Sequence, residues 1–119
     1  MMLLSQRSVV WIRSEIKTPP ISEPAREEMG RLIRRLQRGL VVTMPHSRPM
    51  PEIGRQCHEF RVTDADMSWR VIYRIDADAI IVVSVFSKKT TTTPTSVMQT
   101  CRKRLAEYDQ ALKGRKDDG

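Results

Sequence analysis

The sequence predicts a small α+β domain in which an antiparallel sheet packs against an N-terminal and a C-terminal helix. Three strand candidates follow one another at 57–63, 68–75 and 79–86. The polar links between these candidates are short enough for antiparallel hairpins. Segments with helical periodicity lie before and after them. A chain of 119 residues can bury one hydrophobic core but not two, which predicts a single domain.

The N-terminal third predicts one strand followed by one helix. Residues 9–13 are β-branched or aromatic in the main and favour a short opening strand. Ser22 is the expected N-cap of the helix, with Pro24 in its first turn, and Gly39 closes it. Apolar residues recur at i, i+3, i+4 and i+7 and form the predicted buried face: Met29, Leu32, Ile33 and Leu36.

The opposite face of this helix is rich in arginine. Its basic residues are Arg26, Arg31, Arg34, Arg35 and Arg38. We interpret this run as a solvated helix face or as a docking surface for a large RNA.

The rest of the chain predicts a loop and a final helix around the three strands. Residues 43–54 contain three prolines, one glycine and no periodicity, which indicates a long irregular loop. Thr93 is the expected cap of the last helix and Pro94 its first residue. The predicted domain covers residues 1–112, and residues 113–119 form a polar, frayed tail. The buried stripe of the last helix is expected at Val97, Met98, Cys101, Leu105, Tyr108 and Leu112.

Composition narrows the class of protein. The chain has 21 Lys and Arg residues and 14 Asp and Glu residues, so its net charge is +7. A domain this basic is a candidate for binding a polyanion. Cys57 and Cys101 are too few for a disulfide scaffold and are predicted as small core residues in a reduced compartment. No stretch approaches the length of a membrane span, and no signal peptide is evident. We therefore expect a cytoplasmic protein without a membrane partner.

Side-chain alternation along the strands predicts where the charges lie. In residues 68–75 one face is wholly apolar or aromatic and is taken as the core face: Trp69, Val71, Tyr73 and Ile75. The preceding strand shares that core through Phe60 and Val62, which turns Glu59 and Arg61 outward. Antiparallel pairing then brings Arg61 close to Arg70 on the solvent side. Such like charges repel unless an anion lies between them.

The third strand adds a lysine to the same surface. Pairing of Ile75 with Ala79 keeps Ile81, Val83 and Val85 with the core. The side chains then expected on the face of Arg70 are Ser84, Phe86 and, if the strand runs on by two residues, Lys88. Arg61, Arg70 and Lys88, with Lys89 adjacent, predict an anion site of phosphate size. The alternative is an ordinary solvated sheet face.

The two histidines carry weaker signals. His46 lies in the proline-rich loop, where it could hang over the basic face and shuttle protons, or simply be exposed. His58 has core parity, and we interpret it first as structural. Neither histidine has a partner at metal-ligand spacing, and no phosphate loop or hydrolase motif occurs. We expect no metal and no cofactor.

Taken together, several segments resemble a known family. The chain is similar, from about Val9 to Tyr108, to the phage-derived, HigB-like branch of the RelE/ParE toxin superfamily. The segments that carry this resemblance are 17–20 (KTPP), 44–51 (MPHSRPMP), 57–61 (CHEFR), 69–74 (WRVIYR) and 86–90 (FSKKT).

The resemblance implies a RelE-like α+β fold and a type II toxin–antitoxin function. Such a toxin is an mRNA interferase, an endoribonuclease that cleaves mRNA on the ribosome, and a helix-turn-helix antitoxin neutralises it. The implied catalytic positions are Arg61, Arg70, Lys88 and Lys89, with Glu59 as a candidate base or as the salt-bridge partner of Arg61 or Arg74. Four further candidate RNA contacts are Arg74, His46, Arg48 and His58.

Two other functions fit the same residues. A ParE-like member would poison DNA gyrase by binding, without nuclease activity. A basic, non-catalytic RNA-binding module would bind RNA with strong salt dependence and leave it intact. The RelE group's C-terminal tyrosine has no match soon after Lys89, and Thr90–Thr93 replace the histidine-rich end of some HigB enzymes.

Overall fold

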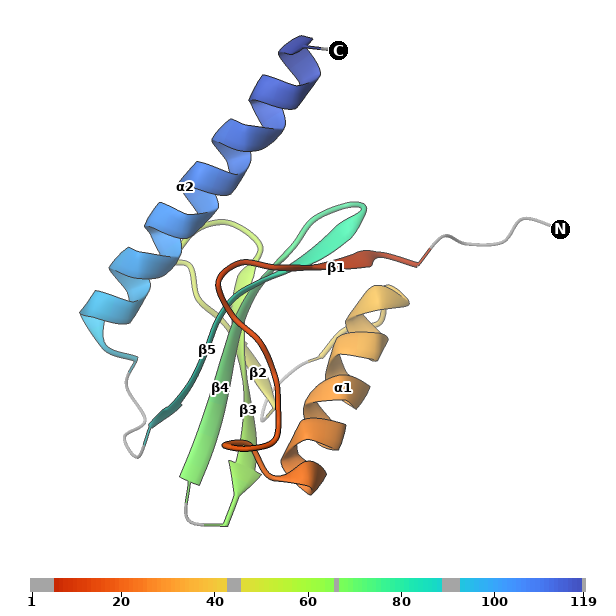
Figure 1. Ribbon diagram of the computed structural model, residues 1–119, viewed down its shortest axis with the longest axis vertical. Helices are drawn as coiled ribbons and strands as arrows, with labels where there is room; N and C mark the ends of the chain where they lie inside the picture. The colour runs from red at the N-terminus through yellow and green to blue at the C-terminus, as the bar shows by residue number, and fades with distance from the viewer. Residues whose placement is uncertain (1–5, 43–45, 66, 89–92, 119) are drawn as a thin grey trace, which may run out of the picture.

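The computed structural model of the protein describes residues 6–42, 46–65, 67–88 and 93–118, and it confirms the α+β fold class (Figure 1). Five strands and two helices make up this part of the chain. In chain order they are β1 (Ser8–Trp11), α1 (Glu23–Gln37), β2 (Ser47–Pro49), β3 (Cys57–Asp64), β4 (Met67–Ile75), β5 (Ala79–Lys88) and α2 (Thr95–Asp118).

The five strands form one sheet with the order β1-β5-β4-β3-β2. The predicted meander β3-β4-β5 is antiparallel, and β1 joins β5 in parallel, so the sheet is mixed rather than antiparallel throughout. The expectation that residues 43–54 hold no regular structure is wrong for Ser47–Pro49, which pairs with β3 as β2. Three residues are too few to show a period, and Pro49 is tolerated because β2 is an edge strand.

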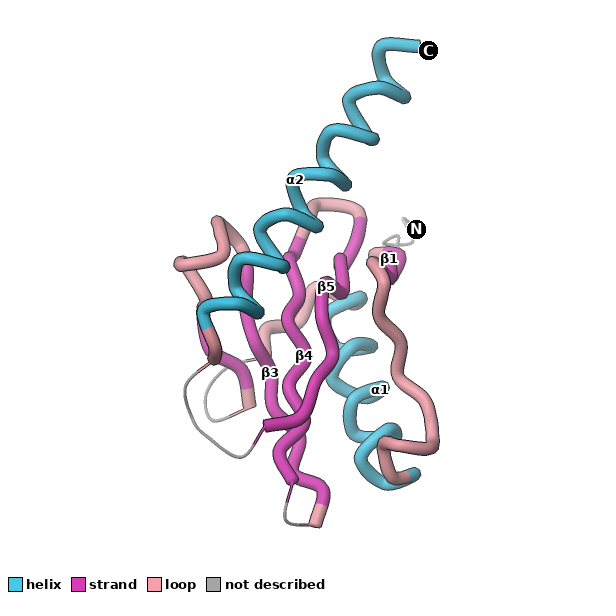
Figure 2. Tube along the Cα trace, turned by 60° about the vertical axis from the view of Figure 1, so that its left-hand side comes forward, coloured by secondary structure: helices cyan, strands magenta, loops and turns pink. Residues whose placement is uncertain are grey.

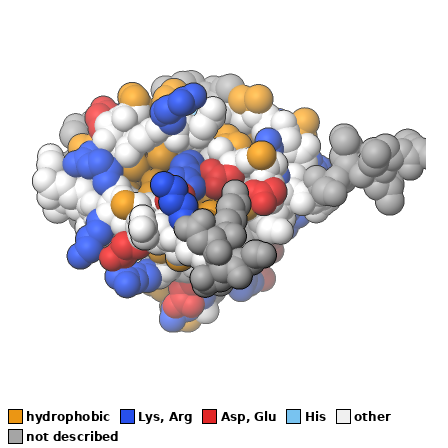
Figure 3. All heavy atoms as spheres, turned by 90° about the horizontal axis from the view of Figure 1, so that it is seen from above, with side chains coloured by type: hydrophobic (Ala, Val, Ile, Leu, Met, Phe, Trp, Pro, Cys, Tyr) orange, Lys and Arg blue, Asp and Glu red, His pale blue; other side chains and the backbone are white. Residues whose placement is uncertain are grey.

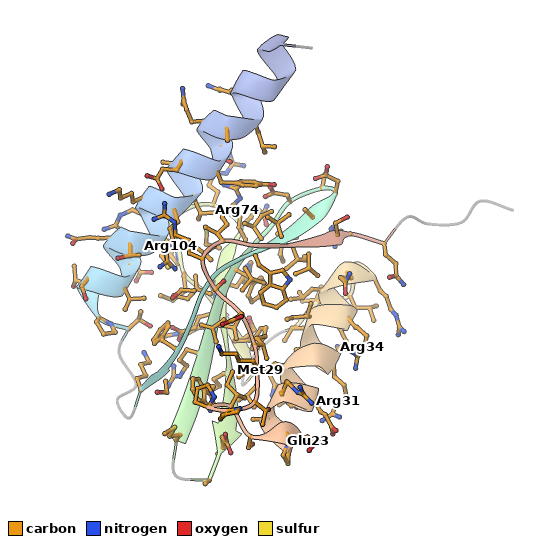
Figure 4. All side chains as sticks on the ribbon, viewed as in Figure 1. Glu23, Met29, Arg31, Arg34, Arg74 and Arg104 are labelled. Carbon is orange, nitrogen blue, oxygen red and sulfur yellow. The ribbon has the colours of Figure 1, made fainter. Side chains whose placement is uncertain are left out.

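The two helices cover opposite faces of the sheet (Figure 2). On α1 the hydroxyl of Ser22 accepts a hydrogen bond from the Ala25 N–H at 3.2 Å, which confirms the predicted cap. Gly39 lies just beyond the helix with φ +83°, a conformation that favours glycine. The predicted apolar face of α1 is buried against the sheet, with Met29 directed toward it in Figure 4.

Each face of the sheet has its own hydrophobic core. The core beneath α1 contains the face predicted from β3 and β4, including Phe60, Val71 and Tyr73. The core beneath α2 contains Ile72, Ile81, Val83, Cys101 and Leu105. Both cysteines are free and buried, in agreement with their prediction as core residues. Because α2 covers the second face, that face is not the open, solvated surface that alternation alone suggested.

The register of β5 differs from the prediction. Ile75 pairs with Ile80 rather than Ala79, and a bulge opposite Ile72 and Tyr73 leaves Val83 as the extra residue. Ile81 and Val83 therefore lie on the α2 side of the sheet. They were predicted to share the α1 core with Val85, which does pack there, so the prediction is wrong for Ile81 and Val83.

The bulge restores the alternation beyond it. From Ser84 to Lys88 the side chains alternate as expected, with Phe86 opposite Arg70 and Lys88 opposite Ser68. The bulged backbone is held from α2, because Arg104 donates a hydrogen bond to the Val83 carbonyl at 2.7 Å (Figure 4).

Helix α2 begins and ends differently from the expectation. Its first backbone bonds run from the N–H groups of Val97 and Met98 to the Pro94 carbonyl. The Thr93 hydroxyl contacts Glu59 and Lys88 instead of capping the helix. The helix continues to Asp118, through most of the predicted tail at 113–119. Neither described helix is long and apolar enough to cross a membrane.

Candidate nucleic-acid interface

The predicted neighbours Arg61 and Arg70 are direct partners in the β3–β4 ladder. This confirms the register that sequence alternation gave for these two strands. Arg48 from β2 and Lys88 from β5 join them, so four neighbouring strands each contribute one cation. We call Arg48, Arg61, Arg70 and Lys88, which surround Glu59, the basic cluster.

Glu59 is the acceptor at the centre of the basic cluster. Its Oε1 accepts hydrogen bonds from Arg70 Nη1 at 2.9 Å and from Arg48 Nη2 at 3.3 Å. Its Oε2 accepts a hydrogen bond of 2.6 Å from the Thr93 hydroxyl. Its partners are thus Arg70 and Arg48, not Arg61 or Arg74 as the sequence suggested. Each of these hydrogen bonds offsets part of the free-energy cost of burying the Glu59 carboxylate.

Burial separates the basic cluster into an inner and an outer part. The Glu59 and Arg70 side chains are 1% and 4% exposed, so their predicted solvent-facing placement is wrong. Ser68 further holds Arg70 by accepting a hydrogen bond from Nε at 3.0 Å. Arg48 keeps 34% of its side chain exposed, and Arg61 and Lys88 are half-buried. An incoming anion therefore meets Arg48, Arg61 and Lys88 first.

Thr93 is the residue of this site that sequence reasoning missed. Its hydroxyl donates to Glu59, and it accepts hydrogen bonds from Lys88 Nζ at 2.9 Å and Arg48 Nη2 at 3.3 Å. A threonine before Pro94 signals a helix cap, and no spacing rule links it to a strand 34 residues earlier. The structure shows that Thr93 connects the carboxylate to two of the four cations.

The environment of Lys88 shifts its acidity. Burial is the largest influence and lowers the pKa of Lys88 below its ordinary value. Glu59 opposes this shift, while the cations of Arg70, Arg48 and Arg61 reinforce it. A lysine with a lowered pKa gives up its proton more readily and is better suited to acid–base work near neutral pH.

The charge balance of the basic cluster favours an anion. Four cations face one carboxylate, which leaves a formal surplus of three positive charges. A hollow of about 150 Å³ lies beside Arg48 and is lined also by Pro49, Thr93 and Met98, among others. Guanidinium groups suit phosphate because they offer paired donors in a plane. The arrangement can therefore bind a phosphate and stabilise additional negative charge on it.

Other predicted site residues lie elsewhere. Lys89 is outside the described residues. Arg74 is bound by two carboxylates, with hydrogen bonds of 2.7 Å to Asp76 and 2.8 Å to Asp109, and Figure 4 places it beside α2, far from the end of β5. Seen from that end of the molecule, acidic and basic side chains are intermixed (Figure 3). Arg74 is thus an ion-pair residue between β4 and α2.

Neither histidine joins the basic cluster. His58 stacks on Tyr73 with ring centroids 5.5 Å apart, and its Nδ1 lies 3.2 Å from the Gln56 carbonyl. His46 is exposed and lines a hollow of about 700 Å³ with residues of α1 and the end of β3. Its carbonyl accepts a hydrogen bond from the Arg61 N–H at 2.8 Å, and Arg61 of the basic cluster lines the same hollow. Across residues 6–42, 46–65, 67–88 and 93–118, no group of three metal-ligating side chains occurs.

Comparison with known proteins adds a family. Neither the curated proteins nor the solved structures contain a match to this chain. Residues 19–106, well over half of the chain, match the family described as phage-derived protein Gp49-like (DUF891), a RelE/toxin-like family in general. The matched region contains β2 to β5 and every residue of the basic cluster. The chain therefore belongs to the phage-derived Gp49-like family.

Proposed function

We propose that this protein is the toxin of a type II toxin–antitoxin pair and that it cleaves mRNA as an endoribonuclease. The observation that carries the proposal is the basic cluster, in which Lys88 has a lowered pKa and lies among three arginines. Membership of the Gp49-like family is consistent with a toxin-like role. The HigB-like resemblance of the strand motifs supports the nuclease rather than another toxic activity.

The proposed chemistry uses the RNA itself as nucleophile. The 2′-oxygen attacks the adjacent phosphorus, its proton passes to water, and the bond to the 5′-oxygen breaks. Negative charge increases on the phosphate oxygens during this step, and Arg48 and Arg61 are the exposed cations that stabilise it. Preorganised donors of this kind are worth about 3 kcal/mol of barrier each in other enzymes. Lys88 in its charged form gives a proton to the leaving 5′-oxygen. Lys89 is the second candidate for that role.

Glu59 and Arg70 act through their neighbours in this proposal. Both are buried, and Glu59 already accepts hydrogen bonds from Arg48, Arg70 and Thr93. A carboxylate that binds three donors is a poor general base, because removing those donors costs free energy. We therefore assign Glu59 and Arg70 to positioning Arg48 and Lys88 at the surface.

The test is primer extension on mRNA in a translating extract with purified protein. Arg61→Ala and Lys88→Ala are the informative variants, since both side chains are half-buried and their removal leaves the Glu59–Arg70 pair intact. Lys103→Ala, an exposed change on α2, is the matched control. We expect cuts within translated codons from the wild type and the control, and at least a hundredfold fewer from each cluster variant.

The other outcomes assign the protein differently. Intact mRNA together with arrested growth and DNA-damage signs would indicate gyrase poisoning by a ParE-like mechanism. Intact mRNA with salt-sensitive RNA binding and no growth arrest would indicate a non-catalytic binding module. Unchanged cleavage by both cluster variants would exclude the basic cluster as the active site.

The proposed partners follow from the proposed activity. Translated mRNA and the ribosome are the substrates, and a helix-turn-helix antitoxin is the neutralising protein. This activity requires a cytoplasmic location. Co-expression with candidate helix-turn-helix proteins tests the antitoxin, since we expect the cognate one to abolish growth arrest and co-purify with this chain.

A further inference from the structure

A second surface, on the α1 side of the sheet, has the features of a peptide-binding groove. We propose that the groove between β1 and α1 binds an extended, acidic segment of another protein as an additional strand beside β1. The groove is lined from β1 by Val9 and Trp11 and from α1 by Arg26, Ile33 and Arg34. It lies across the sheet from the side chains of the basic cluster. The proposal therefore stands independently of the nuclease assignment.

The outer edge of β1 offers backbone groups for pairing. β1 is an edge strand, since β5 is its only partner in the described sheet. Ser8 and Ile12 direct their N–H groups to carbonyls on the β5 side, at Asp78 and Val82. Alternation along a strand then turns the N–H and C=O groups of Val9 and Trp11 toward the outer side. At Arg7 the backbone groups on this same side are already bonded to Gln37 of α1, so the edge available for pairing begins at Val9. An extended chain can pair with such an edge through its own backbone.

Apolar surface at this edge is also exposed. Trp11 is 44% exposed, although large aromatic side chains are usually buried when they have the opportunity. It lies over a groove of about 300 Å³ whose floor includes Val9, Ile16 and Ile33. Tryptophan is also one of the residue types enriched among the energetically dominant residues of protein interfaces.

The charge on the groove selects an acidic partner. Among the described residues, neither Arg26 nor Arg34 makes an ion pair or a hydrogen bond through its side chain. Their neighbours on the same helix differ: Arg31 binds Glu28, and Arg35 donates to the Val41 carbonyl. Two cations without carboxylates, one on each side of Gly30, therefore flank the apolar floor. Acidic side chains that alternate with apolar ones would match both features.

Gly30 at the centre of α1 lines the groove beside Arg34. Glycine in a helix interior is destabilising by roughly 1 kcal/mol relative to alanine, so its presence calls for a local reason. A Cβ atom at this position would lie 3.3 Å from Arg34 Nη1. The absent side chain thus lets the Arg34 guanidinium lie against the helix beside the groove.

An extended acidic peptide fits better than two other occupants. A second copy of this chain, paired through β1, would bring Arg26 and Arg34 of both copies to one interface, where like charges repel. RNA would supply negative charge and ribose hydroxyls, but not the alternating N–H and C=O groups, spaced as in a strand, that pair with a sheet edge. A polypeptide supplies donors, acceptors and carboxylates together.

The experiment is an NMR titration of the whole protein with a designed probe. The probe is an eight-residue peptide of alternating Glu and Val with blocked ends, and the matched control replaces Glu by Lys. We expect the acidic peptide to shift the amides of Val9 and Trp11 and the Trp11 indole N–H, and to slow their hydrogen exchange. The Lys peptide should leave these signals unchanged.

Three variants test whether peptide binding in the groove causes these NMR shifts. Arg26→Glu with Arg34→Glu should weaken peptide binding at least tenfold, while Arg31→Glu on the same helix should leave it within twofold. Gly30→Ala removes no charge and favours the helix, and because the Arg34 guanidinium needs to move only slightly to admit the Cβ atom, we expect it to leave binding within twofold. Equal losses from all arginine variants would overturn the proposal in favour of nonspecific charge attraction.

Two further results would also overturn it. A single-stranded oligoribonucleotide that shifts the β1 amides more strongly than the peptide would make this surface a nucleic-acid site. Concentration-dependent dimerisation in sedimentation, abolished by Trp11→Ser, would make it a contact between copies. Because neither the groove variants nor these measurements involve the basic cluster, mRNA cleavage should be unchanged in Gly30→Ala.

Discussion

The Arg70 guanidinium donates a 2.9 Å hydrogen bond to the Glu59 carboxylate, and both side chains are almost fully buried. This pair links β3 to β4 beneath the N-terminal end of α2. Buried ion pairs add little net stability compared with apolar residues of the same shape. They become critical only when one partner is removed, because the other charge then remains buried without compensation.

We therefore expect Glu59→Ala to destabilise the fold by about 3–5 kcal/mol, the usual cost of breaking a buried pair. Urea denaturation followed by circular dichroism measures this change. The double variant Glu59→Gln, Arg70→Met should lose clearly less unfolding free energy than the single variants Glu59→Gln and Arg70→Met lose when their losses are added. Additive losses would show that the two side chains contribute independently.

The proposed role of Lys88 predicts a specific pH profile. Its pKa is lowered by burial and by the nearby arginines, so the charged form is lost at lower pH than for an ordinary lysine near 10.4. If the charged form protonates the leaving oxygen, cleavage rates should fall as the pH rises, with an apparent pKa below that value. Initial rates on a single-site RNA between pH 6 and 10 give the profile.

Lys88→Arg is the matched control for this profile. Arginine keeps the positive charge throughout the range but does not donate its proton readily. We expect a slow enzyme whose rate no longer falls in the alkaline range. An unchanged alkaline fall in this variant would assign the titration to another group, Lys89 first.

The environment of Asp64 predicts how the free energy of unfolding changes at acid pH. Hydrogen bonds from the side chain and the backbone N–H of Ser22, with a further one from Trp69, lower the pKa of Asp64. A lowered pKa stabilises the folded state above the ordinary aspartate pKa of about 3.9, and that stability is lost as the pH falls through the folded value. We expect Asp64→Asn to reduce the slope of unfolding free energy against pH below 4. A slope equal to the wild type would contradict this.

The burial of the two cysteine thiols predicts slow chemical labelling in the folded protein. Burial raises the pKa of Cys101 to about 11 and also raises that of Cys57, so neither is a thiolate at neutral pH. We expect iodoacetamide at pH 8 to label both cysteines only after unfolding in urea. Peptide mapping by mass spectrometry resolves the two sites. Rapid labelling of Cys101 in the native protein would show that the core beneath α2 opens readily.

Alternation predicted the β3–β4 register because both strands have one clearly apolar face. It failed in β5, where residues 79–83 form a continuous apolar run that fits either face. Such runs are typical of strands buried on both sides, and here α2 supplies the second cover. The pairing error and the bulge each shift β5 by one residue in the same direction, and a total shift of two residues restores the predicted face, so Lys88 still lies on the face where it was predicted.

The buried state of Glu59 and the role of Thr93 were not predictable in the same way. Both depend on how α2 and the chain before it pack on the sheet, which no local pattern encodes. The sequence shows only that the Glu59 side chain points away from the α1 core. In the structure this side chain is buried, so Glu59 is a buried hydrogen-bond acceptor and not an exposed base. The predicted roles of Arg61 and Lys88 in RNA cleavage remain predictions.

The contributions to the basic cluster arrive in the order of synthesis. Arg48 is made first, then Glu59, Arg61 and Arg70, then Lys88, and finally Thr93, which supplies the last described hydrogen bond to the carboxylate. A growing chain that has emerged only as far as β4 has the arginines but neither the hydroxyl nor the lysine. Synthesis must therefore pass three quarters of the chain, and release it from the exit tunnel, before this surface exists. Under the proposed function, the nascent chain therefore lacks a complete catalytic surface for as long as it is being translated.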